Sequence, residues 1–159
     1  LQAALVHDAF KRREWEMVEA AKRAERSPSE ANRESELTSE KFLIDAGFNT
    51  FVVSCAHATG DVGLELMRSG KQNLPQMIVF YADCCVSNDK IVGYTRRFDD
   101  LLPHFQPGGR YEWANKAFLE KHGMTHRQTY DRTVLPLEEE LAKVIGFQGN
   151  PADLFTLAL

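Results

Sequence analysis

The chain has 159 residues, of which 43% are hydrophobic, and its formal net charge is −4 at neutral pH. This length suits one globular domain with its own hydrophobic core, and the negative charge argues against a protein that binds nucleic acid mainly through phosphate contacts. The longest apolar runs span about six residues, whereas a membrane-spanning helix needs about 20, so we expect no such helix.

The N-terminal third is predicted to contain a strand, two helices and a loop. The apolar stretch AALVH predicts a strand over residues 3–7, and the spacing of apolar and charged residues predicts a helix over 11–26. Residues 27–39 are polar and include a proline, so they are predicted to form a surface insertion. A short helix is expected over 39–46, ending at Gly47.

The middle of the chain is predicted to alternate strands with a helix. The β-branched and aromatic stretch FNTFVVSC favours a strand over 48–55, and residues 60–69 are expected to form a helix. The continuously apolar run over 77–81 is typical of a central strand that is covered on both faces. Residues 90–94 are expected to pair with it as an antiparallel hairpin.

The C-terminal third is predicted to be helical. Helices are expected over 111–121 and about 135–145, followed by the apolar tail ADLFTLAL. The resulting order of strands and helices predicts an α/β fold with a mixed sheet.

The cysteines and the start of the chain indicate a cytoplasmic location. Cys55, Cys84 and Cys85 are odd in number, and two of them are adjacent, so no disulfide framework is expected. The chain has no Asn-x-Ser/Thr glycosylation motif, and its first residues become charged too soon for a signal peptide. Reduced thiols in the cytoplasm are therefore expected.

The stretch NLPQMIVFYADCCVSNDKIVGY places Pro75 at the entrance of the predicted central strand. This pattern resembles the C-terminal half of a thioredoxin fold, in which a cis-proline precedes that strand, and the resemblance implies that role for Pro75. The family's paired cysteines would fall near Arg12 and Trp15, neither of which is cysteine. The resemblance therefore implies a redox-inactive protein without catalytic residues or a cofactor.

Among redox-inactive members of that fold, VVSCAHATGDVGLELMRSGKQNLPQMIVFY and AFLEKHGM resemble phosducin-like proteins. The resemblance implies a thioredoxin-like mixed β-sheet flanked by helices over residues 1–126. The 27–39 insertion and a C-terminal helical extension over 127–159 depart from the family pattern. The resemblance also implies a protein-binding module that modulates G-protein βγ subunits or assists folding by a cytosolic chaperonin.

Two basic clusters are candidates for partner binding. The first, Lys11, Arg12 and Arg13, lies where the redox pair would be, and the second is Arg96 with Arg97. Such clusters are also the usual pattern of a solvated helix start. As docking patches they would attract an acidic partner surface and set its orientation.

The cysteines and histidines suggest two other kinds of chemistry. A thiol-dependent enzyme that uses Cys55 or Cys84 is the alternative function. His122 and His126 have the spacing of metal ligands on a helix, but Gly123 between them is expected to end that helix, so no metal site is predicted.

Overall fold

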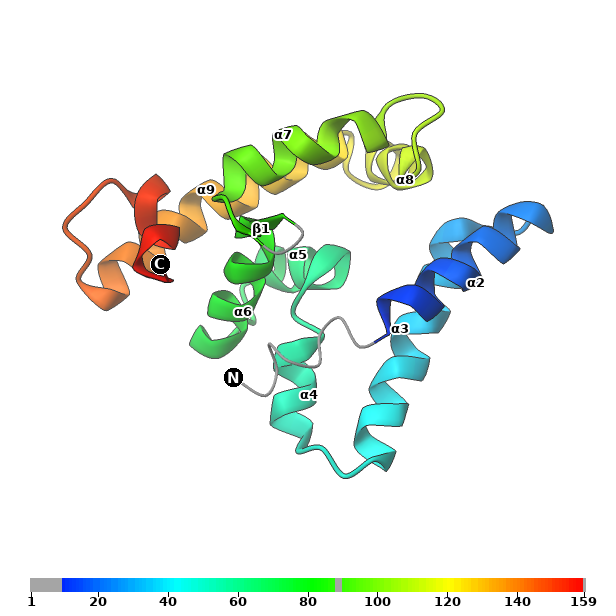
Figure 1. The fold of residues 1–159 in the computed structure, drawn as a ribbon, viewed down its shortest axis with the longest axis horizontal. Coiled ribbons are helices and arrows are strands. Elements are labelled where there is room, and N and C mark those ends of the chain that lie inside the picture. The colour runs from blue at the N-terminus through cyan, green and yellow to red at the C-terminus, as the bar shows by residue number, and fades with distance from the viewer. Residues whose placement is uncertain (1–9, 88–89, 159) are drawn as a thin grey trace.

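The computed structural model describes residues 10–87 and 90–158, and it is built almost entirely from helices (Figure 1). In chain order the elements are α2 (Lys11–Arg23), α3 (Pro28–Asp45), α4 (Thr50–Ala56), α5 (Gly60–Ser69), α6 (Leu74–Cys85), β1 (Val86–Ser87), β2 (Lys90–Ile91), α7 (Tyr94–Phe105), α8 (Glu112–His122), α9 (His126–Ile145) and the 3₁₀ helix η1 (Pro151–Ala158).

The predicted fold class, a thioredoxin-like mixed β-sheet flanked by helices, is wrong. In the part of the chain that the structure describes, the only sheet is an antiparallel pair in which Val86 faces Ile91 and Ser87 faces Lys90. The strands predicted over 48–55 and 77–81 are the helices α4 and α6. The strand predicted over 3–7 lies outside the described residues.

Helix α6 shows why the strand prediction failed. Asn73 caps the helix by accepting a hydrogen bond from the backbone N–H of Gln76, and the Gln76 side chain accepts from the N–H of Asn73 in return. Pro75 occupies the first turn, where a missing N–H costs nothing. No cis peptide bond occurs in the described residues, so the predicted cis-proline at Pro75 is wrong and the bond is trans.

Helix α6 lies at the centre of the body and contacts α4, α5, α7 and α9 (Figure 1). Its buried residues Met77, Phe80, Tyr81 and Cys84 follow the helical spacing i, i+3, i+4, i+7. The hydroxyl of Tyr81 donates to the buried carboxyl group of Glu138 on α9 at 3.0 Å. This bond ties α6 to α9 inside the core.

Helix α9 is the longest helix and closes the core. Thr125 caps its start in a second reciprocal pair, with Gln128. Its buried face, which includes Val134, Leu137 and Leu141, joins the same core cluster as α6, and Leu154 of η1 completes it. The described part of the predicted extension, residues 127–158, therefore supplies part of the central core.

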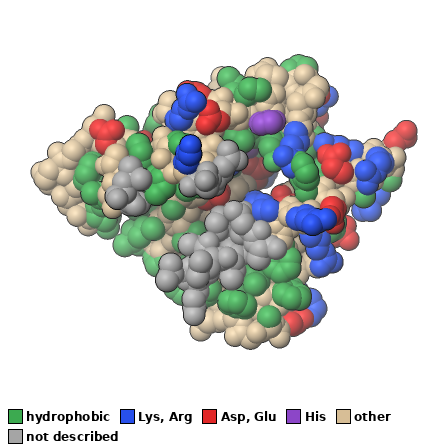
Figure 2. All heavy atoms as spheres, in the orientation of Figure 1, with side chains coloured by type: hydrophobic (Ala, Val, Ile, Leu, Met, Phe, Trp, Pro, Cys, Tyr) green, Lys and Arg blue, Asp and Glu red, His purple; other side chains and the backbone are tan. Residues whose placement is uncertain are grey.

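Helices α2 and α3 pack antiparallel and form an arm that leaves the body (Figure 1). The predicted loop over 27–39 is wrong, because Ser27 caps α3 and Pro28 begins it. The exposed surface of the arm mixes Lys and Arg with Asp and Glu (Figure 2). The arm also reaches the body through Lys22, which donates to the carbonyl of Arg110 at 3.1 Å.

Candidate partner-binding groove

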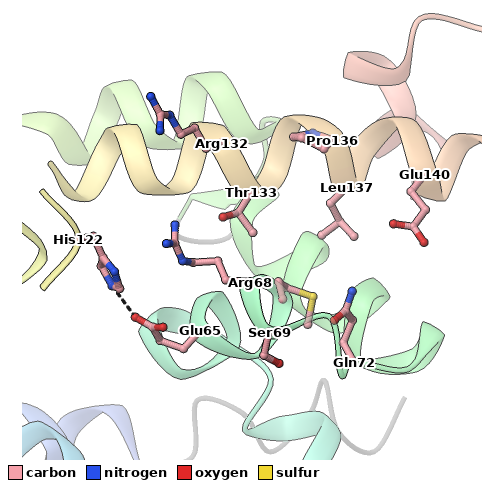
Figure 3. Close-up of a pocket in the computed structure, with 11 residues that line it drawn as sticks. Glu65, Arg68, Ser69, Gln72, His122, Arg132, Thr133, Pro136, Leu137 and Glu140 are labelled. Atoms are coloured by element: carbon pink, nitrogen blue, oxygen red, sulfur yellow. Dashed lines mark hydrogen bonds and ion pairs between the residues drawn. The ribbon is translucent and has the colours of Figure 1, made fainter. Parts of the chain in front are cut away.

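A groove lies between α5 and α9, with a volume of about 560 Å³ (Figure 3). It is lined from α5 and the following loop on one side, from α9 on the other, and by the last residue of α8. The lining residues are Glu65, Met67, Arg68, Ser69, Gln72, His122, Arg132, Thr133, Pro136, Leu137 and Glu140. The α9 residues recur at helical spacing, so one face of α9 forms one wall of the groove.

One end of the groove is held together by Glu65. Its carboxylate accepts from Lys121 at 2.9 Å and lies 2.7 Å from Nε2 of His122 (Figure 3). Burial raises the pKa of Glu65, but the hydrogen bonds with Lys121 and His122 outweigh it, and the pKa lies below its ordinary value. Glu65 is thus an ionised carboxylate whose partners both come from α8.

The groove carries two arginines without a partner. Arg68 extends from α5 toward α9, whereas the side chain of Arg132, which also lines the groove, leaves α9 on the side away from α5 (Figure 3). Both side chains are exposed, and within the described residues neither forms an ion pair or a hydrogen bond. Arg127, earlier on α9, is by contrast held by Asp131 at 2.8 Å and Asp99 at 3.1 Å.

The floor of the groove combines apolar and polar groups. Met67 and Leu137 are buried there. The side-chain oxygen of Gln72 is also buried, and it has no hydrogen-bond partner. Glu140 lines the groove on the same helix face as Thr133, two turns further along α9 (Figure 3). The groove therefore offers both cations and hydrogen-bond acceptors.

The basic clusters predicted from the sequence lie elsewhere. Lys11, Arg12 and Arg13 form the exposed first turn of α2, where Arg12 pairs with a glutamate of its own helix at 3.1 Å. Arg96 and Arg97 begin α7, and Arg96 pairs within that helix at 3.2 Å. Helix α2 packs on α3, whereas α7 packs on α6, α8 and α9. Their role in partner binding stays a prediction.

The two histidines predicted not to bind metal lie on different helices. Gly123, with a left-handed φ of 64°, ends α8 directly after His122, and His126 begins α9. Nε2 of His126 lies 3.0 Å from the carboxylate of Asp61 at the start of α5. Within residues 10–87 and 90–158, no three His, Cys, Asp or Glu side chains are arranged to hold a metal ion.

A carboxyl group with an unusual pKa lies where the arm meets the body. Burial, followed by the negative charges of Glu14 and Asp61, raises the pKa of Glu36 to about 7. The charge of Lys11 and a hydrogen bond from Asn32 at 2.9 Å lower it in part. Helix α3 of the arm thus carries a group that titrates near neutral pH.

We expect Glu36 to make stability depend on pH. Its ordinary pKa is 4.5, so between pH 4.5 and about 7 the unfolded chain has lost a proton that the folded chain keeps. The free energy of unfolding should therefore fall as the pH rises through this window, and this contribution should level off above it. Glu36→Gln removes the effect.

The measurement is urea unfolding of both proteins from pH 5 to pH 8. The wild type should lose about 1–3 kcal/mol more than Glu36→Gln over this range, after allowing for partial solvent screening. If the free energy of unfolding changes equally with pH in both proteins, the pKa of Glu36 in the folded protein is not raised.

The three cysteines are buried free thiols. Burial raises the pKa of Cys84 well above its ordinary value, and the charge of Asp83 adds to this. Burial also raises the pKa of Cys85 to about 12, although hydrogen bonding with Tyr81 opposes it. These environments are the opposite of those that activate a catalytic thiolate.

We expect all three thiols to react slowly in the folded protein. A small alkylating reagent at neutral pH should label Cys55, Cys84 and Cys85 many times more slowly than it labels the urea-unfolded chain. Mass spectrometry of peptides gives the rate for each residue. Rapid labelling of one thiol in the folded state would support the thiol-dependent enzyme that the sequence left open.

Comparison of the chain with models of protein families, with curated proteins and with solved structures finds no match. The phosducin-like resemblance therefore stays a prediction, without the sheet on which it depended. Among the described helices, none combines the length and hydrophobicity that crossing a membrane requires. A proposal about function therefore has to be based on the residues that line the groove.

Proposed function

We propose that the chain is a non-catalytic protein-binding module whose groove between α5 and α9 takes an acidic segment of a partner protein. The proposal depends on one observation, the side chain of Arg68, which extends across the groove toward α9 and has no hydrogen-bond or ion-pair partner among the described residues (Figure 3). Arginine binds carboxylates through paired, charge-assisted hydrogen bonds. The groove keeps this capacity because Glu65 is occupied by Lys121 and His122.

The chemistry of the groove supports an acidic partner segment, but it does not identify a particular partner protein. G-protein βγ subunits and a cytosolic chaperonin were expected on the basis of a thioredoxin-like sheet, and that basis is gone. The whole chain is negatively charged, whereas the groove lining balances Arg68 and Arg132 against Glu65 and Glu140. Because Lys121 and His122 already engage Glu65, Arg68 is left to attract an acidic segment.

Selection from a library of random peptides displayed on phage tests the proposal. We expect the wild-type protein to enrich peptides that contain Asp or Glu. A soluble peptide from that selection should bind Arg68→Glu at least about tenfold more weakly, because hydrogen bonds to charged groups contribute about 1.5–3 kcal/mol. Fluorescence polarisation gives the two affinities.

Arg33→Glu is the matched control. Arg33 is also exposed and lacks an ion pair within the described residues, but it lies on α3 of the arm, and its reversal changes the net charge equally. Its affinity should stay within about twofold of the wild type. An equal loss in both variants, or selection of peptides without acidic residues, would contradict the proposal.

A further inference from the structure

Glu140 is a second charged group of the groove that has no partner. Its side chain extends from α9 toward Gln72, which lies in the loop after α5 (Figure 3). The side chain is exposed, and among the described residues it forms no ion pair or hydrogen bond. Glu65, the other carboxylate of the lining, is already engaged by two residues of α8. Glu140 is therefore the carboxylate left to bind a cation.

Arg68 and Glu140 lie toward opposite ends of the groove. The guanidinium group of Arg68 points to the part of the groove between His122 and Thr133, whereas Glu140 lies seven residues after Thr133 on the same face of α9 (Figure 3). Seven residues of an α-helix span about 10 Å, so the free cation and the free carboxylate are separated by roughly this distance. They are too far apart to pair with each other, and each can bind a different residue of one partner segment.

The floor between these two charges is apolar. Leu137 lies on α9 between Thr133 and Glu140, and it is buried together with Met67 of α5. An apolar group on a ligand would remove further apolar surface from water here. An inorganic anion held by Arg68 would reach neither this floor nor Glu140. The order of groups along the groove thus favours a peptide segment over a small anion.

We propose that the partner segment carries a Lys or Arg residue that binds Glu140, in addition to the acidic residue that binds Arg68. Residues of an extended segment advance about 3.3 Å each, so the acidic and basic residues should lie about two to four positions apart. The inference rests on the proposed function and adds a second required residue and an orientation. The acidic residue lies toward α8, and the basic residue lies toward the loop after α5.

Glu140→Lys distinguishes such a segment from a purely acidic one, because the two should respond in opposite directions. If the phage-selected peptide has a basic residue at Glu140, the reversal should weaken its binding about three- to tenfold. A purely acidic peptide would bind more tightly, since the reversal replaces a nearby negative charge with a positive one. Fluorescence polarisation gives the affinities, and circular dichroism confirms that each variant is folded.

Glu139→Lys is the matched control. Glu139 is the preceding residue of α9 and is also exposed, but it does not line the groove, and its reversal changes the net charge equally. We expect its affinity for the same peptide to stay within about twofold of the wild type.

Charge-swapped peptides identify which residues pair. A peptide in which Glu replaces the basic residue should bind Glu140→Lys more tightly than it binds the wild type, and double-mutant cycles should couple Glu140 to this position more strongly than to the acidic one. Unchanged or tighter binding of the selected peptide by Glu140→Lys, an equal loss in Glu139→Lys, or selection of acidic peptides without Lys or Arg would overturn the inference. Selection of peptides without acidic residues would instead remove the proposed function, and the inference with it.

Discussion

Replacing Phe80 by alanine is expected to lower the free energy of unfolding by about 3–5 kcal/mol. Phe80 is 0% exposed at the centre of α6 and packs near the ring of Tyr130, 6.1 Å away between centroids. Its removal leaves a cavity that helices on several sides cannot all move to fill. Urea unfolding followed by circular dichroism measures the loss.

Ile78→Ala on the same helix is the matched control, and we expect it to cost less than about 1 kcal/mol. Ile78 is 48% exposed, because residues two apart on a helix point in directions about 200° apart. On the strand predicted from the sequence, residues 78 and 80 would share one face and one degree of burial. Equal losses at the two positions would contradict the helix.

Gly63→Ala is expected to destabilise the protein by about 1–3 kcal/mol, although alanine is normally favoured over glycine inside a helix by about 1 kcal/mol. A Cβ atom at Gly63 would lie 2.5 Å from the backbone carbonyl of Ala58 and 2.7 Å from the ring of Phe80. The close approach of α5 to these groups therefore requires a residue without a side chain. Thermal and urea unfolding give the sign of the change.

Val62→Ala provides the comparison for Gly63. Val62 is the preceding residue of α5 and is exposed, so its replacement should change the free energy of unfolding by no more than about 0.5 kcal/mol. Stabilisation by Gly63→Ala would show that helix propensity outweighs packing here, and the close approach of α5 and α6 would then be wrong.

Helices with a clear polar and apolar face could be predicted from the sequence. The helix predicted over 60–69 agrees with α5, and those over 11–26 and 111–121 agree with α2 and α8 apart from their ends. In each, apolar residues recur at helical spacing and charged residues fill the remaining face. The periodic signal was sufficient because one face of each helix meets solvent.

Buried apolar segments were the main source of error. FNTFVVSC and MIVFY are rich in β-branched and aromatic residues, and a short apolar run does not distinguish a strand from a helix by periodicity. The residues that cap these segments do distinguish a helix from a strand. Asn49 accepts a hydrogen bond from the N–H of Phe51, and Asn73 forms a capping box with Gln76. Reading Asn-Leu-Pro-Gln as a helix start would have identified α6.

The groove could not be found from local sequence, since its two walls lie about sixty residues apart in the chain. Basic clusters such as Lys11 to Arg13 attract notice because their charges are adjacent, whereas Arg68 and Arg132 are single arginines on separate helices.

Nuclear magnetic resonance most directly tests whether this groove is the binding site. The phage-selected peptide is titrated into ¹⁵N-labelled protein, and the shifts of the backbone amides are followed. We expect the largest shifts at the amides of Arg68, Gln72, Thr133 and Leu137. The amides of helix α3 in the arm, including that of Arg33, should not shift. Larger shifts in the arm, α2 and α3, or in the first turn of α7, with the groove amides unchanged, would contradict the account.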